Sequence, residues 1–273
     1  MQVKTFSTPR GKLTYWVNKF QPERTTLVFL PGVAADARQY LLEIDYFYEK
    51  YNLFVWDPPA HGKSRPFSLD FTLMECAEWL ECILCMEKAE NIVLIGASMG
   101  GCLAQCYIER YPERASGFVS INSVPLKEGN FTSREIWVLK NIEKILKIFS
   151  WGRLLKKVPD NSSLTVLAQA GMLEMMLSYE KEYYINLIGH TFRNLLGAID
   201  AGLPYKITCP ALLIRGDHNY FKAIDRCNQT WSKETGIKLE TLIDAGHQAN
   251  SDQPEETQML IDEFLESNGL NTL

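Results

Sequence analysis

The chain has 273 residues, of which 46% are hydrophobic and 22% are charged, and its formal net charge is −5 at pH 7. This balance is typical of a globular protein and excludes a largely disordered chain, and the length suffices to bury a core without disulfide or metal staples. The acidic balance argues against a broad basic surface for nucleic acid. At about 150 residues per domain, the length predicts one or two domains.

The number and pattern of the cysteines and the first residues of the chain indicate the cellular compartment. Seven cysteines, an odd number, lie mostly in apolar helical patterns, which predicts free thiols in a reducing environment. Cys82 and Cys85 have no second Cys or His pair at metal-ligand spacing nearby, so packing is the favoured role for both. The first residues lack the apolar stretch of a secretory signal, and no run of about 18 apolar residues occurs. We therefore expect a cytoplasmic protein without a membrane partner.

Short apolar runs alternate with turn residues in the first half of the chain. Their β-branched and aromatic content predicts strands at 13–17, 26–30, 52–56, 91–95 and 118–121. Such near-continuous apolar strands indicate burial on both faces, as in a parallel sheet. Helical patterns at 73–88 and 101–111 fill gaps between them. The alternation predicts an α/β fold, doubly wound, with a mostly parallel central sheet and helices on both faces.

This alternation stops near residue 124. Strand patterns return at 210–214 and 238–243, and a last helix is predicted at 255–265. The segments 133–157 and 164–200 between them are helical in pattern. The chain therefore divides into an α/β core of residues 1–125 and 206–273 and an inserted, all-helical cap of residues 126–205. Cap side chains that suggest either a pocket roof or plain core are Trp137, Trp151, Met172, Met175, Met176, Tyr183, Tyr184 and Phe192.

The segment 95–101 carries the clearest chemical signal. It reads Ile-Gly-Ala-Ser-Met-Gly-Gly, a G-x-S-x-G motif between a buried strand and a helix. Small residues let the chain reverse sharply, which exposes the hydroxyl of Ser98 on a strained turn. The helix N-terminus behind the serine offers free N–H groups to an oxyanion. Ser98 is therefore the candidate nucleophile.

A serine nucleophile needs a base, and the chain has four histidines. His190 lies in a cap helix pattern, His61 lies in a loop that can line a pocket mouth, and His218 ends a strand. His247 follows a glycine-bearing loop after the last predicted strand, which places it at the carboxyl edge of the sheet together with Ser98. Open α/β sheets bind ligands at that edge. His247 is therefore the candidate base.

By these residues the chain resembles the α/β-hydrolase fold enzymes with a helical cap, over nearly its whole length. The resemblance is carried by residues 30–32, 57–64, 96–101, 214–219 and 245–247. The family order is nucleophile, acid, histidine, and here Ser98 precedes the Asp217 region, which precedes His247. The resemblance implies an oxyanion hole made by the backbone N–H groups of Met99 and Val33. It implies no metal or organic cofactor.

The acid departs from the family pattern. The family reads Gly-x-x-Asp after this strand, and here the residues are Gly-Asp-His-Asn, so Asn219 stands at the usual acid position. The other acid position used by some members falls near Asn122, also an amide. In serine proteases, changing this acid to Asn lowers kcat by about 10⁴. Either Asp217 or Asp225 supplies the carboxylate, or Asn219 orients His247, or the protein is catalytically weak.

These features predict a serine hydrolase that cleaves a small-to-medium carboxylic ester, amide or related acyl substrate through an acyl-enzyme. A second hypothesis is a ligand-binding or receptor-like member with little turnover, because an aspartate is missing at position 219. A third is a C–C bond hydrolase or lyase, since the fold hosts both. In each case we expect a small-molecule partner.

Overall fold

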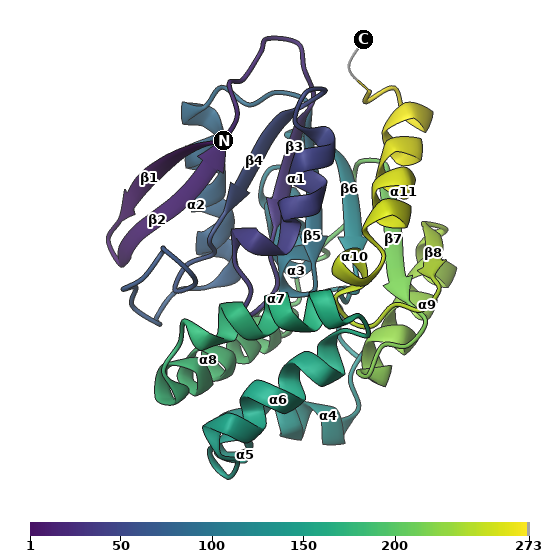
Figure 1. Ribbon diagram of the computed structural model, residues 1–273. Coiled ribbons are helices and arrows are strands. Elements are labelled where there is room, and N and C mark those ends of the chain that lie inside the picture. Colours follow the sequence, from purple (N-terminus) through teal and green to yellow (C-terminus); the bar gives the residue numbers. More distant parts are fainter. Residues whose placement is uncertain (272–273) are drawn as a thin grey trace.

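The structure is a computed structural model that describes residues 1–271. In this part of the chain, eight strands form one sheet in the order β1-β2-β4-β3-β5-β6-β7-β8 (Figure 1). Their bounds are β1 Gln2–Thr8, β2 Gly11–Val17, β3 Thr26–Leu30, β4 Asn52–Trp56, β5 Ile92–Ala97, β6 Ala115–Ile121, β7 Ala211–Gly216 and β8 Lys238–Leu242. β1 and β2 pair antiparallel, as do β2 and β4, and every other neighbouring pair is parallel. The mostly parallel sheet predicted from the sequence is confirmed.

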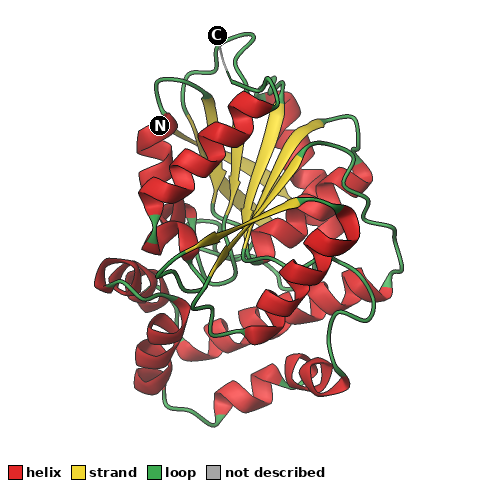
Figure 2. Ribbon diagram, turned by 90° about the vertical axis from the view of Figure 1, so that its right-hand side faces the viewer, coloured by secondary structure: helices red, strands yellow, loops and turns green. Residues whose placement is uncertain are grey.

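Helices cover both faces of this sheet (Figure 2). One core layer joins α2, α3 and α9 to alternate strand residues such as Val28 and Leu94, and the other joins α1 and α11 to Leu27 and Val93. All five residues of β3 and of β4 are buried, as expected for strands covered on both sides. The helices outside the segment between β6 and β7 are η1 Ala37–Tyr40, α1 Leu41–Phe47, α2 Leu73–Met86, α3 Met99–Arg110, α9 Lys222–Thr235, α10 Ala249–Asp252 and α11 Pro254–Ser267.

Five helices, here called the cap helices, separate β6 from β7 in the sequence. In Figure 1 they lie across the end of the sheet toward which β6 and β7 point. The helical pattern at 133–157 is divided at Asn141 and at Ser150, whose side chain accepts a hydrogen bond from the Arg153 N–H and begins a new helix. The cap helices are α4 Ser133–Lys140, α5 Ile142–Lys147, α6 Trp151–Ser162, α7 Val166–Leu177 and α8 Lys181–Asp200.

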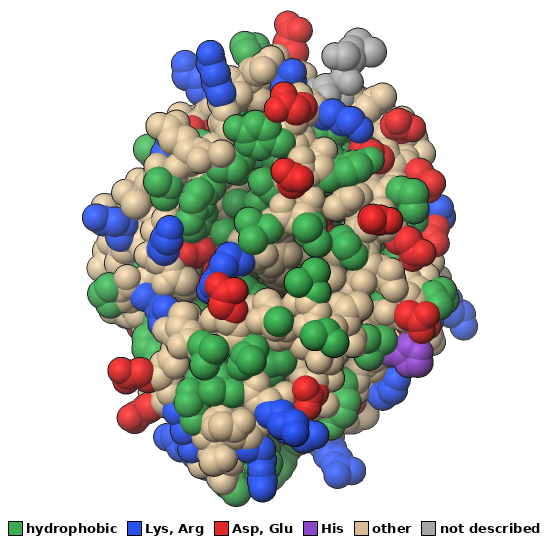
Figure 3. Space-filling model, viewed as in Figure 1, with side chains coloured by type: hydrophobic (Ala, Val, Ile, Leu, Met, Phe, Trp, Pro, Cys, Tyr) green, Lys and Arg blue, Asp and Glu red, His purple; other side chains and the backbone are tan. Residues whose placement is uncertain are grey.

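The outer side of the cap helices carries apolar side chains that the core does not cover. Val166 and Leu167 at the start of α7 are 81% and 74% exposed, and Ile148 after α5 is 80% exposed. Figure 3 shows hydrophobic side chains scattered over the side of the molecule seen in Figure 1, with Lys and Arg side chains among them toward the cap helices. None of the helices described is long and apolar enough to cross a membrane.

Several elements carried no clear sequence signal. β1 alternates exposed and half-buried residues and is held by β2, so its pattern lacks an apolar run. α9 buries only Cys227, Asn228 and Trp231 along a mostly polar segment. The seven cysteines are unpaired, as predicted, but Cys82 and Cys85 are exposed, so the packing role expected for them was wrong.

Candidate active site

Ser98 lies on the tight turn between β5 and α3. Its backbone has φ 50° and ψ −114°, a conformation that non-glycine residues rarely adopt. The turn fits because Gly100 lets α3 lie against the end of β3: a Cβ placed at Gly100 would lie 1.9 Å from the carbonyl oxygen of Leu30. The sequence motif therefore produces the strained serine turn that it predicts.

His247 reaches Ser98 from the loop after β8. Its Nε2 lies 3.0 Å from the Ser98 Oγ, although 149 positions separate the two residues. The ring of Phe221 packs edge-on against the imidazole, with ring centroids 5.1 Å apart. Burial lowers the pKa of His247 to about 4, and no charged neighbour contributes to this shift. The imidazole is therefore neutral at pH 7.

Asn219 is the residue that meets the other ring nitrogen. Its amide Nδ2 lies 3.4 Å from Nδ1 of His247 and donates to the Oδ1 of Asn122 at 3.0 Å. Its Oδ1 accepts a hydrogen bond from the Phe221 N–H at 3.0 Å. The side chain is fully buried. An amide, rather than a carboxylate, therefore contacts His247 at the usual acid position.

Asn122 follows β6, at the alternative acid position. Its Nδ2 donates to the carbonyl oxygens of Gly246 at 3.0 Å and His247 at 2.8 Å, and its Oδ1 accepts from the Gly216 N–H at 3.3 Å. These hydrogen bonds connect the loop that carries His247, here called the histidine loop, to the ends of β6 and β7. Asn122 does not contact the imidazole ring directly.

The two aspartates considered as alternative acids point elsewhere. Asp217 accepts a hydrogen bond from the Ala245 N–H at 3.2 Å and lies 3.8 Å from the exposed imidazole of His218. Asp225 lies 3.6 Å from Arg215 and 3.7 Å from Lys222. Neither carboxylate contacts His247. Of the three candidates, the structure brings Asn219 alone to the ring.

Asp252 is a site residue that the sequence did not reveal. Its buried carboxylate accepts hydrogen bonds from the Gly246 N–H at 2.8 Å and from the N–H groups of Leu164 and Thr165 at the start of α7. It thereby joins the histidine loop to the cap helices. No local sequence pattern indicates this role. Two of the three backbone donors lie before α7, far away in the sequence, and the third lies in the loop that carries His247.

The two backbone N–H groups expected to form an oxyanion hole come from separate segments of the chain, the loop after β3 and the start of α3. Val33 and Met99 line one cavity, and neither N–H donates to another group in residues 1–271. Gly32 makes the close approach possible, since a Cβ there would lie 3.3 Å from the Cβ of Ser98. The Gly32 N–H is itself held by the side chain of Gln39, whose Oε1 accepts it at 2.9 Å. Gln39 is a second residue that the sequence did not indicate.

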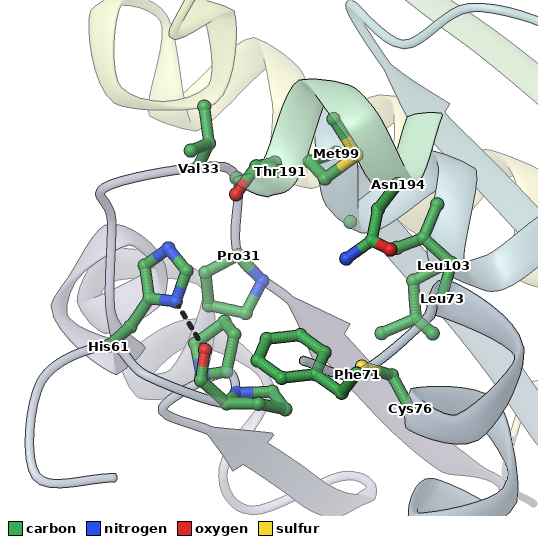
Figure 4. Close-up of a pocket in the computed structure, with 14 residues that line it drawn as sticks. Pro31, Val33, His61, Phe71, Leu73, Cys76, Met99, Leu103, Thr191 and Asn194 are labelled. Carbon is green, nitrogen blue, oxygen red and sulfur yellow. Dashed lines mark hydrogen bonds between the residues drawn. The ribbon is translucent and has the colours of Figure 1, made fainter. Parts of the chain in front are cut away.

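The cavity that Val33 and Met99 line is small, about 40 Å³, and mainly apolar. A water needs roughly 10–15 Å³ by this measure, so the space holds a few heavy atoms. Figure 4 shows its wall, to which α8 contributes Thr191 and Asn194. The complete lining is Pro31, Gly32, Val33, Pro58, Pro59, His61, Phe71, Leu73, Cys76, Met99, Gly100, Leu103, Thr191 and Asn194.

None of the eight cap side chains considered as either a pocket roof or plain core lines this cavity. Met172, Met175, Met176 and Tyr184 are buried in the main core, whereas Trp137 is exposed. Helix-spaced Met and aromatic side chains here serve packing. His190, on α8, is buried, and its Nε2 lies 3.0 Å from the Nδ2 of Asn194.

The loop 57–64 forms one side of the cavity. The Asp57 carboxylate accepts hydrogen bonds from the N–H groups of Ala37 at 2.9 Å and Lys63 at 2.5 Å, and burial raises its pKa to about 6. His61 donates from Nδ1 to the Pro59 carbonyl at 2.9 Å (Figure 4), and burial lowers its pKa to about 4. Its Nε2 is buried and has no hydrogen-bond partner within residues 1–271. No group of three or more His, Cys, Asp or Glu in that range could hold a metal ion.

The parallel sheet, the strained serine turn and the serine–histidine contact at the carboxyl edge are the features of an α/β hydrolase. Residues 25–254 match the family described as alpha/beta hydrolase fold. The chain belongs to this family, which is one of hydrolases with esterases among its members.

Individual relatives are distant. The chain is 30% identical over 111 residues to the pimeloyl-[acyl-carrier protein] methyl ester esterase of Yersinia enterocolitica, covering 41% of this chain and 40% of that protein. It is 29% identical over 105 residues to the (E)-2-((N-methylformamido)methylene)succinate hydrolase of Acinetobacter baylyi, covering 38% of this chain and 40% of that protein. The chain thus spans about two fifths of the length of these curated relatives. Monoacylglycerol lipase ABHD6 of Homo sapiens is 22% identical over 271 residues, covering 89% of this chain and 76% of that protein.

Solved structures show the same fold. A thermophilic esterase from Thermogutta terrifontis has a TM-score of 0.76 at 17% identity, covering 98% of this chain and 99% of its own. The enol-lactonase from Burkholderia xenovorans has a TM-score of 0.74, also at 17% identity, covering 96% and 100%. At these identities the likeness establishes the fold alone.

Proposed function

We propose that the protein is a serine hydrolase acting on a small carboxylic ester or related acyl compound. The observation that carries the proposal is the 3.0 Å separation between His247 Nε2 and Ser98 Oγ, within hydrogen-bond reach for proton transfer. The free N–H groups of Val33 and Met99 support an oxyanion hole beside the serine. Residues 126–205 act as a cap over a core built from 1–125 and 206–273.

The reaction has two halves. The Ser98 Oγ attacks the acyl carbon, its proton passes to His247 Nε2, and the carbonyl oxygen becomes an oxyanion facing Val33 and Met99. When the carbon–oxygen bond to the leaving group breaks, His247 returns the proton to the departing alcohol. Water then attacks the acyl-enzyme, gives a proton to His247, and releases the carboxylic acid as Ser98 recovers its proton.

The proposed substrate carries a short acyl group. The cavity beside the free N–H groups is about 40 Å³ and mainly apolar, which suits an acyl chain of a few carbons. The names of two relatives, a methyl ester esterase and a monoacylglycerol lipase, describe the cleavage of carboxylic esters and support this reaction class.

Labelling by a fluorophosphonate probe tests the nucleophile. The wild-type chain is expected to form a covalent adduct at Ser98, and Ser98→Ala is expected to form none. Ser267→Ala, at an exposed position on α11, is the matched control and should label as the wild type does. Equal labelling of Ser98→Ala and wild type would remove Ser98 from its role.

A ligand-binding member with little turnover is the second candidate. The observation that favours it is the pair of amides, Asn219 and Asn122, at both positions where a carboxylate would serve His247. Hydrolysis of p-nitrophenyl acetate and p-nitrophenyl butyrate separates the two functions. Rates near the uncatalysed background, together with saturable binding of the butyrate ester, would favour the binding protein over the hydrolase.

A further inference from the structure

The directions of the hydrogen bonds around Asn122 are fixed by its neighbours. Its Nδ2 faces two backbone carbonyl oxygens, those of Gly246 and His247, which can only accept. Its Oδ1 faces the Gly216 N–H, which can only donate. Reversing this amide would set oxygen against oxygen twice and leave an N–H unpaired. Asn122 therefore presents an acceptor, Oδ1, to Asn219.

Asn219 is fixed in turn. Its Nδ2 lies 3.0 Å from that acceptor, and its Oδ1 lies 3.0 Å from the Phe221 N–H. Both contacts would be lost if the amide were reversed. The NH₂ group that faces the Asn122 Oδ1 is also the group 3.4 Å from Nδ1 of His247. Nδ1 therefore meets a donor rather than an acceptor.

We infer that the Asn122–Asn219 pair holds His247 in the tautomer with its proton on Nε2. In this tautomer Nδ1 accepts from Asn219, and the Nε2–H donates to the Ser98 Oγ across 3.0 Å. The opposite tautomer would set the Nδ1–H against an NH₂ group in a buried place, leaving donors unpaired. Asn122 and Asn219 are positioning residues for this proton.

The inference deepens the proposed function, on which its kinetic consequence rests. A general base at Ser98 needs a free lone pair on Nε2, and the resting tautomer does not offer one. His247 must first move its proton from Nε2 to Nδ1, against the amide pair. Acylation is therefore slow, and the cause is the amide pair on the side of His247 that faces away from Ser98.

The tautomer can be read without any activity measurement. In protein labelled with ¹⁵N-histidine at pH 7, long-range ¹H–¹⁵N correlation distinguishes the two ring nitrogens, and His247→Gln assigns the signals by their disappearance. We expect the proton of wild-type His247 on Nε2. A proton on Nδ1 in the wild type would overturn the inference.

Two variants test whether the amide pair is the cause. Asn219→Asp offers Nδ1 an acceptor and Asn219→Ala removes the donor, so each is expected to shift the proton toward Nδ1. Asn268→Asp, which adds the same charge at an exposed position after α11, should leave the tautomer unchanged. An Nε2 proton that persists in both Asn219 variants would overturn the role of the pair.

Kinetics complete the test. Restoring the carboxylate with Asn219→Asp is expected to raise kcat by at least about tenfold, up to about the 10⁴-fold known for this exchange in serine proteases. Fluorophosphonate labelling separates the two proposals. An Nε2–H tautomer in a chain whose Ser98 does not label supports the inference and refutes the hydrolase. A chain whose Ser98 labels and whose His247 carries its proton on Nδ1 supports the hydrolase and refutes the inference.

Discussion

The Oδ1 of Asn122 lies 3.0 Å from the Nδ2 of Asn219, and this contact joins the two chain positions at which family members carry the catalytic acid. Both side chains are fully buried. Neither carries charge, so His247 has no carboxylate to stabilise its protonated form. Ser98 and His247 lie within hydrogen-bond reach of each other, as the proposed function requires, whereas a neutral, hydrogen-bonded amide pair stands where that function would place a carboxylate.

The first prediction concerns the pH dependence of hydrolysis. His247 accepts a proton only when neutral, and burial lowers its pKa to about 4. The kcat/KM of the wild type for p-nitrophenyl acetate is therefore expected to hold as the pH falls through 6 and to drop near pH 4. A drop between pH 6 and 7 would contradict the prediction.

In Asn219→Asp, the drop of kcat/KM at low pH should occur at a higher pH than in the wild type. A carboxylate beside the ring favours the imidazolium, which raises the pKa of His247 above its wild-type value. The same pH series, measured on Asn268→Asp as a charge-matched control, is expected to follow the wild type. An unshifted drop in Asn219→Asp would mean that the new carboxylate does not reach the imidazole.

The second prediction concerns Gln39 and the oxyanion loop. Gln39→Leu removes the acceptor of the Gly32 N–H, which frees the backbone just before Val33. We expect kcat to fall about 10- to 100-fold, less than or comparable to the loss of one oxyanion donor, and stability to fall by about 1–3 kcal/mol.

Gln258→Leu is the control for this change. Gln258 is buried to a similar degree and donates to the Leu42 carbonyl at 3.1 Å, on α11 and away from the serine. It should lose stability while keeping kcat. Equal effects of the two substitutions on kcat would show that Gln39 acts only through general stability.

The third prediction concerns Glu43, a buried carboxyl group on α1. It accepts a hydrogen bond from Asn250 at 3.2 Å, and burial raises its pKa from 4.5 to about 8. Between these two pH values the folded chain holds a proton that the unfolded chain has released. The contribution of Glu43 to the free energy of unfolding is therefore greatest below pH 4.5 and is lost as the pH rises to 8.

Glu43→Gln should remove this pH dependence, since an amide of nearly the same shape cannot ionise. The free energy of unfolding of the variant minus that of the wild type is expected to rise by roughly 2–4 kcal/mol from pH 5 to pH 9. Urea unfolding at both pH values measures the difference. A constant difference across that range would contradict the pKa shift.

The fourth prediction compares two helical glycines. In Gly100→Ala the new methyl would lie 1.9 Å from the Leu30 carbonyl oxygen, a backbone atom that cannot yield cheaply. We expect the free energy of unfolding to fall by about 3 kcal/mol or more. We also expect Ser98 to lose its labelling by the fluorophosphonate probe. At Gly171, inside α7, nothing lies within 4 Å of a new Cβ, so Gly171→Ala should gain about 1 kcal/mol from helix propensity. Urea unfolding measures both, and a neutral Gly100→Ala would refute the close approach.

Much of the fold could be predicted because its signals are local. The runs at 26–30 and 52–56 are strands with those same bounds, since strands buried on both faces are apolar at nearly every position. β1 could not be predicted in this way, because a half-exposed edge strand owes its pairing to β2 rather than to its own composition. The role of the cap side chains stayed open for a related reason: a helical stripe shows that a face is buried but not what covers it.

For the site, the sequence by itself determined the strained serine turn, since the glycines around Ser98 leave room for the sharp reversal between strand and helix, where a Cβ would clash. It also placed His247 at the carboxyl edge by its position after the last strand. Only the tertiary structure decided which side chain meets the imidazole, and in which direction its amide points. Apart from the bond donated by the nearby Phe221 N–H, those hydrogen bonds join residues 28 to 125 positions apart. Their donors and acceptors are set by backbone groups of neighbouring strands and loops, which come together only when the sheet has formed.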